Sequence, residues 1–193
     1  MRKVLFLLLS VGVVSTGCGS NEETATNATE TTAESKPATP PQSKLGEAGT
    51  SKLMGVVTDY YSLKDALVAT DAAKADEAAK KLMASADSFK ASGVSDSVDM
   101  VVRYMDSVSM GSKQILSLKD ETTEQKRIHF EKVSDAMFGA LRAAELKNGG
   151  VYRQYCPMAF NDKGAFWLSD VTDIKNPYFG KKMLECGEVT DSL

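Results

Sequence analysis

Four successive stretches between residues 45 and 148 repeat apolar residues every three or four positions, and this period constrains the fold more than any other feature. Residues at that spacing lie on one face of an α-helix. The first stretch shows the pattern in Leu53, Val56, Tyr60, Leu63 and Leu67. Four amphipathic helices with short connections predict a mainly α protein, an antiparallel four-helix bundle over residues 47–148.

Turn and cap residues mark the ends of the expected helices. Thr70 or Asp71 is expected to cap the second helix, and Thr122 with Gln125 has the spacing of a capping box at the start of the fourth. The inward stripe of the fourth helix is expected to consist of Ile128, Val133, Met137, Ala140, Leu141 and Ala144. The methionines interpreted as core residues by their helical spacing are Met100, Met105, Met110 and Met137.

The composition changes after residue 149. Half of the chain's Phe, Trp and Tyr residues lie between Tyr152 and Phe179. Short strands are expected at 151–155, 165–169 and 188–190, with a turn at 161–164 and a short helix through 181–184. The sequence therefore predicts a small C-terminal α+β cap over residues 149–193, packed on one end of the bundle because it is too small for a stable core of its own.

The N-terminus has the pattern of an export signal over residues 1–18. Arg2 and Lys3 precede an apolar run that is short for a membrane-spanning helix, and small residues lead to Cys18. This ending resembles the lipobox of bacterial lipoproteins, in which the cysteine is acylated, although Ser15 stands where leucine is favoured. The alternative is an ordinary signal peptide, which leaves Cys18 removed or free. Both readings predict an exported protein in which disulfides can form.

Residues 19–46 are expected to form a disordered tether. From Gly19 to Ser43 there is no large apolar residue, so this stretch cannot bury enough surface to offset its ordering entropy. The tether and its lipid would be the only attachment to the membrane, with the folded part on the periplasmic side. A net charge of −3 offers no electrostatic basis for binding nucleic acid.

Four sulfur residues occupy matched places near the two ends of one segment: Cys156, Met158, Met183 and Cys186. Thiolate and thioether together are the ligands that a soft ion such as Cu(I) prefers, whereas zinc sites usually include histidine. The Met183–Cys186 spacing of one helical turn can place both sulfurs on one face. A disulfide between Cys156 and Cys186, with the methionines as core residues, is the alternative that spacing alone leaves open.

Other residues offer weaker chemistry. His129 is the single histidine and is either a surface or partly buried helical residue, or a further metal ligand if its end of the bundle meets the sulfur segment. The chain has no phosphate-binding glycine loop and no Cys-x-x-Cys pair. We therefore expect a protein that is not an enzyme; a thiol enzyme is the remaining catalytic reading.

The run VYRQYCPMAFNDKGAFWLSDVTDIKNPYFGKKMLECGEV, together with YYSLKDAL at 60–67, resembles the family called domain of unknown function 3347 over roughly residues 47–190. Members of that family occur as exported small proteins and as C-terminal extensions of the periplasmic adaptors of heavy-metal efflux pumps. The resemblance implies handling of copper or a similar soft metal by Cys156, Met158, Met183 and Cys186, with an efflux adaptor as partner. The rival expectation is a disulfide-stapled envelope interaction module without metal.

Overall fold

The computed structural model describes residues 39–91, 99–118 and 122–193. The expected export signal, Cys18 and the tether up to residue 38 lie outside the described residues. Among the helices that are described, none is both long and apolar enough to cross a membrane.

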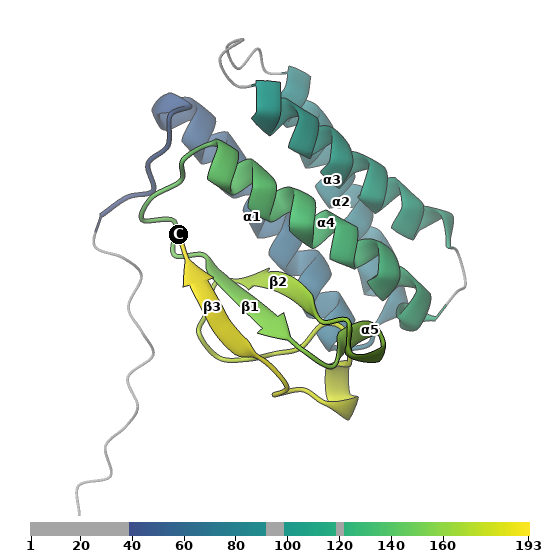
Figure 1. Ribbon diagram of the computed structural model, residues 1–193. Helices are drawn as coiled ribbons and strands as arrows, with labels where there is room; N and C mark the ends of the chain where they lie inside the picture. The colour runs from purple at the N-terminus through teal and green to yellow at the C-terminus, as the bar shows by residue number, and fades with distance from the viewer. Residues whose placement is uncertain (1–38, 92–98, 119–121) are drawn as a thin grey trace, which may run out of the picture. The chain divides into compact units, whose positions relative to one another are not determined.

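Four long helices pack side by side, and consecutive helices run in opposite directions (Figure 1). They are α1 (Gly46–Val68), α2 (Ala72–Ala91), α3 (Asp99–Ser117) and α4 (Thr123–Ala143). A small three-stranded antiparallel sheet follows them. The expected mainly α fold, with four packed helices and a small C-terminal cap, is confirmed.

The helix ends agree only in part with the expected caps. Asp71 precedes α2, and its Oδ1 accepts a hydrogen bond from the backbone N–H of Lys74 at 3.0 Å, as an N-cap residue does. Thr122 occupies the N-cap position of α4 but makes no side-chain cap hydrogen bond, so the expected capping box is wrong. α4 ends at Ala143, with Ala144 as its C-cap, five residues before the expected end of the bundle at residue 148.

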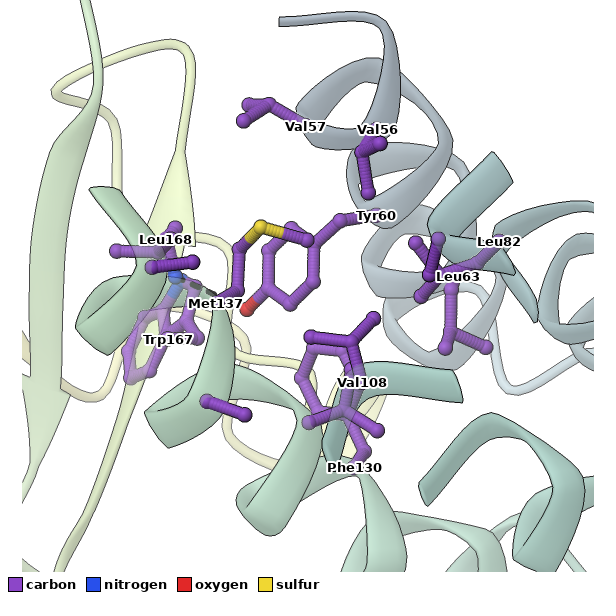
Figure 2. Packing of buried hydrophobic residues seen from close by; sticks show 14 of the residues in the cluster. Val56, Val57, Tyr60, Leu63, Leu82, Val108, Phe130, Met137, Trp167 and Leu168 are labelled. Carbon is purple, nitrogen blue, oxygen red and sulfur yellow. Dashed lines mark hydrogen bonds between the residues drawn. The ribbon is translucent and has the colours of Figure 1, made fainter. Parts of the chain in front are cut away.

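The core joins the bundle to the sheet at Tyr60 of α1 (Figure 2). The rings of Tyr60 and Phe130 stack with centroids 5.3 Å apart, which ties α1 to α4. The Tyr60 hydroxyl lies 2.7 Å from the hydroxyl of Ser134 and accepts a hydrogen bond from the backbone N–H of Leu168 at 3.1 Å. A buried hydroxyl needs such partners, and here one comes from each layer.

Three residues expected in the core are exposed. Met100, Met110 and Ile128 are 52%, 60% and 42% exposed, so the assignments of these three to the core are wrong. In α3 the inward face is taken by residues that keep the three-and-four spacing, namely Val101, Met105, Val108, Gly111, Ser112 and Ile115. The corresponding face of α4 carries Arg127 and Phe130, which turns Ile128 toward solvent.

The cap is an antiparallel sheet with strand order β2-β1-β3. Its strands are β1 (Tyr152–Cys156), β2 (Ala165–Ser169) and β3 (Glu188–Ser192), close to the expected ranges. The connection α5 (Ala159–Asp162) is a left-handed turn, because Phe160, Asn161 and Asp162 all have φ between 55° and 62°. A short 3₁₀ turn, η2 (Gly180–Lys182), stands where the short helix was expected, one to two residues earlier.

The last residues of the expected tether are part of the folded domain. Gln42 and Lys147 exchange two backbone hydrogen bonds of 3.0 and 2.8 Å, and the N–H of Lys44 donates to the carbonyl of Ala144 at 3.0 Å. The folded part therefore includes Gln42, four residues before the expected end of the tether.

Candidate site at the paired cysteines

The sheet brings the two late cysteines together. Cys156 is the last residue of β1, paired with Ala165 of β2, and Tyr155 pairs with Glu188 of β3. Since Cys186 stands two residues before Glu188, the register places it beside the end of β1. The two Sγ atoms are 3.2 Å apart, and both cysteines are free thiols.

The 3.2 Å between the two sulfurs is longer than a disulfide bond and shorter than the distance between two thiolates that share one metal ion. A disulfide needs its sulfurs at about 2.05 Å. Two thiolates bound to one metal ion at about 2.3 Å each stand about 3.8 Å apart at a tetrahedral angle and about 4.6 Å apart when collinear. The observed 3.2 Å requires a movement of the order of 1 Å in either direction.

The two thiols have different surroundings. Cys156 is fully buried, whereas Cys186 is partly exposed. The pKa of the Cys186 thiol is raised, first by its hydrogen bond with Cys156 and then by burial. A neighbouring thiol and a partly dry environment both favour the protonated form.

The two methionines are both more exposed than Cys156. Met158 is 46% exposed, and Met183 is half-buried. Met183 has φ −148° and ψ 61°, outside the helical region, so the expected helical alignment of its side chain with Cys186 is wrong. The N–H of Cys186 instead donates to the carbonyl of Met183 at 3.3 Å and closes a turn. No hydrogen bond joins either thioether to a thiol in the described part of the chain.

His129 faces another helix. Its Nδ1 is 3.1 Å from Oε1 of Gln114 on α3. Burial and then the charge of Lys132 lower the pKa of the imidazole. Within residues 39–91, 99–118 and 122–193 no group of three or more His, Cys, Asp or Glu side chains could hold a metal ion.

Asn176 holds the segment that carries Cys186. It is fully buried, and its Nδ2 donates to the carbonyl of Cys186 at 2.7 Å. Its Oδ1 accepts from the N–H groups of Tyr178 and Phe179, and its own N–H donates to the carbonyl of Leu184 at 2.8 Å. One side chain thus connects the turn at 176–180 with residues 184–186. No sequence pattern indicated this role of Asn176.

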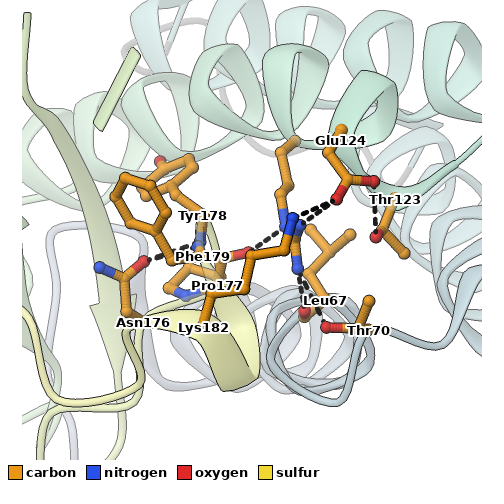
Figure 3. A network of polar contacts seen from close by, with 10 residues as sticks. Leu67, Thr70, Thr123, Glu124, Asn176, Pro177, Tyr178, Phe179 and Lys182 are labelled. Carbon is orange, nitrogen blue, oxygen red and sulfur yellow. Dashed lines mark hydrogen bonds and ion pairs between the residues drawn. The ribbon is translucent and has the colours of Figure 1, made fainter. Parts of the chain in front are cut away.

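Arg127 of α4 joins the same turn to the bundle. Figure 3 shows its partners Pro177, Leu67, Thr70 and Glu124. Its Nε donates to the carbonyl of Pro177 at 2.7 Å, and its Nη2 donates to the carbonyl of Leu67 at 3.0 Å and to Thr70 Oγ1 at 3.2 Å. Nη1 lies 3.6 Å from Glu124. Sequence reasoning missed this residue. A charged side chain within one turn of Phe130 on an apolar face was the only available signal.

Gly187, the residue after Cys186, packs closely against the ring of Trp167. Trp167 is the chain's single tryptophan and is fully buried. Gly187 has φ 150°, and a Cβ placed there would stand 2.8 Å from both the Trp167 ring and the carbonyl oxygen of Tyr155. The chain can approach the sheet at this point only because residue 187 has no side chain.

A second surface feature is an open groove between α1 and α2, with a volume of about 610 Å³. Its buried carboxylate, Asp59, already accepts a hydrogen bond from Ser85 and pairs with Lys81 at 2.9 Å. The carboxylate in the groove is therefore already paired. The cysteine pair remains the better candidate for chemistry.

The helical bundle carries the family signal. Residues 56–149 match the family model described as protein of unknown function (DUF3347). The chain contains a DUF3347 domain. Neither a curated protein nor a solved structure matches the chain.

The DUF3347 match begins within α1 and ends after α4, so it includes the run at residues 60–67 but stops before β1. The resemblance expected over 47–190 is thus shown for the bundle. The cysteine pair stands outside the matched range, and its chemistry must be argued from its own geometry.

Proposed function

We propose that this DUF3347 protein binds one soft cation, Cu(I), between the thiolates of Cys156 and Cys186. The observation that carries the proposal is the 3.2 Å separation of the two free sulfurs, which are thirty residues apart in sequence. Soft ions select sulfur over oxygen and imidazole. A pair of thiolates that stands apart from histidines and carboxylates favours a soft ion over zinc or magnesium.

Two thiolates are sufficient donors for Cu(I), which tolerates low coordination numbers. Met158 and Met183 then supply weaker thioether contacts once the cation has drawn the segment into place. The fit requires the sulfurs to separate by the order of 1 Å, and the partly exposed Cys186 has room to move. We assign the protein to binding and delivery of the metal, not to catalysis.

The cellular setting of the proposal rests on the N-terminal sequence for export and the lipid anchor, and on the family resemblance for the partner. The protein is exported, acylated at Cys18 and held on the periplasmic side of a membrane by its lipid, with a heavy-metal efflux adaptor as recipient of the cation. The Cys18→Ser protein should either leave the membrane fraction for the soluble fraction or keep its signal sequence uncleaved. A clickable fatty acid should label only the parent chain. Equal labelling of both chains contradicts the lipid anchor.

The competing function is a disulfide-stapled interaction module. The same pair can close by about 1 Å to form a bond, which export permits. A bonded pair takes up no Cu(I) until it is reduced. Counting free thiols by mass spectrometry under non-reducing conditions, in protein taken directly from the envelope, separates the two: a bonded pair in every molecule favours the module.

Metal binding is tested by titrating the reduced full chain, carrying Cys18→Ser, with Cu(I) against a chromogenic chelator. We expect one equivalent to bind, and Cys156→Ser or Cys186→Ser to abolish binding while the helical circular dichroism is kept. Met158→Leu and Met183→Leu should weaken binding by less than either cysteine change. His129→Gln is the matched control, because His129 contacts Gln114, and it should leave the Cu(I) affinity unchanged. Binding that survives both cysteine changes overturns the proposal.

A further inference from the structure

The two cysteines of the candidate site differ in how strongly their backbone is restrained and in how deeply they are buried. Cys156 lies at the end of the central strand, with β2 and β3 on either side, and is fully buried. Cys186 lies in the irregular segment between η2 and β3 and is partly exposed. The backbone of Cys156 is thereby fixed by the sheet, whereas that of Cys186 depends on isolated bonds.

Those bonds restrain the backbone of Cys186 but leave its side chain free. Its carbonyl accepts from Asn176 Nδ2 at 2.7 Å, and its N–H donates to the carbonyl of Met183 at 3.3 Å. Neither contact involves the sulfur, whose recorded partner is Cys156. Rotation about χ1 can therefore move Sγ of Cys186 without breaking a backbone bond, whereas Sγ of the fully buried Cys156 is enclosed by its neighbours.

The approach to the pair is open on the side of Cys186. Leu184 and Glu185 on its own segment are exposed, as are Pro157 and Met158, which follow Cys156. Cys156 itself has no exposed surface. An incoming sulfur ligand therefore reaches a cation in the site next to Cys186.

From this asymmetry we infer that Cys186 is the exchange thiol of the site and Cys156 the retained thiol, and that the cation passes to a partner that presents a thiol. The inference rests on the proposed Cu(I) function. In the exchange step the partner's thiolate forms a bond to Cu(I), the bond between Cu(I) and Cys186 breaks, and the freed Cys186 thiolate takes up the proton released by the partner's thiol. Copper stays Cu(I) throughout, so no oxidant or reductant is needed.

The transfer is completed when a second thiolate of the partner forms a bond to Cu(I), the bond between Cu(I) and Cys156 breaks, and the Cys156 thiolate takes up the proton of that second thiol. The asymmetry thus gives the exchange a fixed order.

Metal-free labelling tests the order of the thiols. In the reduced full chain with Cys18→Ser, a limiting amount of iodoacetamide should modify Cys186 at least about tenfold faster than Cys156, as judged by peptide mass spectrometry. Two single-cysteine chains separate the accessibility of each thiol from its interaction with the other thiol. Cys186 should be labelled fast in Cys156→Ser, and Cys156 should be labelled slowly in Cys186→Ser. Equal rates, or faster labelling of Cys156, overturn the inference.

Exchange itself is tested with Cu(I)-loaded protein and glutathione as the thiol probe. The rate of copper loss should rise in proportion to glutathione concentration, because the incoming thiol takes part in the step. A rate independent of glutathione overturns the inference. Failure of Cu(I) to bind overturns the proposed function instead, and it is distinguishable because the labelling experiment needs no metal.

Discussion

The side-chain amide of Asn176 donates a hydrogen bond to the backbone carbonyl of Cys186, with 2.7 Å between nitrogen and oxygen. Asn176 is fully buried, and its Oδ1 accepts from two further N–H groups, so three of the four hydrogen bonds that its side chain can make are formed inside the cap. The position of Cys186 opposite Cys156 thus depends on a residue ten positions earlier in the chain.

Asn176→Ala should destabilise the protein by roughly 2–4 kcal/mol, because a buried carbonyl and two N–H groups lose their partner. Urea unfolding followed by circular dichroism measures this change. The same variant should bind Cu(I) more weakly than the parent chain. Its neighbour Lys175 is exposed, so Lys175→Ala is the control and should alter the free energy of unfolding by less than about 0.5 kcal/mol. Equal effects of the two changes would show that Asn176 does not hold the segment.

Gly187→Ala should destabilise the cap by about 1–3 kcal/mol, since the added methyl meets Trp167 and the Tyr155 carbonyl at 2.8 Å and the residue keeps a positive φ. Trp167 is the only tryptophan, so its fluorescence reports the change directly. Gly55→Ala is the matched glycine control: a Cβ there has nothing within 4 Å, and it should stabilise α1 by up to about 1 kcal/mol. Parent-like fluorescence and stability in Gly187→Ala would contradict the close approach.

Arg127→Met should destabilise the protein by roughly 2–4 kcal/mol, because it keeps most of the side-chain volume but leaves the buried carbonyl of Pro177 without its donor and removes one of the donors to the carbonyl of Leu67. Guanidinium titrations monitored by circular dichroism and by Trp167 fluorescence should both shift. Arg103 on α3 is exposed, so Arg103→Met should shift neither curve appreciably. Equal shifts of the unfolding curves in Arg127→Met and Arg103→Met would contradict the proposed link between bundle and cap.

The pKa of Cys186 should fall when Cys156 is replaced by alanine, because the hydrogen bond that chiefly raises it is then lost. A raised pKa means less thiolate at a given pH. As the pH is increased, the alkylation rate of Cys186 should therefore begin to rise at a lower pH in Cys156→Ala than in a chain with both cysteines. The pH profile of iodoacetamide labelling measures the midpoint, and an unchanged midpoint would mean that the two thiols do not interact.

The bundle was predictable because its signal is local. Residues such as Leu53, Tyr60 and Leu63 define a helix face through spacing alone, and all three are buried. One error in the core arose where two apolar neighbours competed for one inward position. Met100 is exposed beside the fully buried Val101, because consecutive residues of a helix point in different directions.

The candidate site was predictable in composition but not in geometry. The spacing of Met183 and Cys186 implied a shared helical face, but the chain leaves the helical region at Met183. Arg127 and Asn176 gave no comparable signal, because their partners Pro177, Leu67 and Cys186 are brought to them by the fold.

By its apolar period and its turn residues, the sequence alone determined that this chain forms four helices followed by short strands, since both patterns act within a few residues. Only the tertiary structure decided that the sulfurs of Cys156 and Cys186 stand 3.2 Å apart while one is buried and the other partly exposed. The physical reason is strand register: pairing of Tyr155 with Glu188 is a long-range contact, and a slip of one residue would turn each side chain to the other face of the sheet.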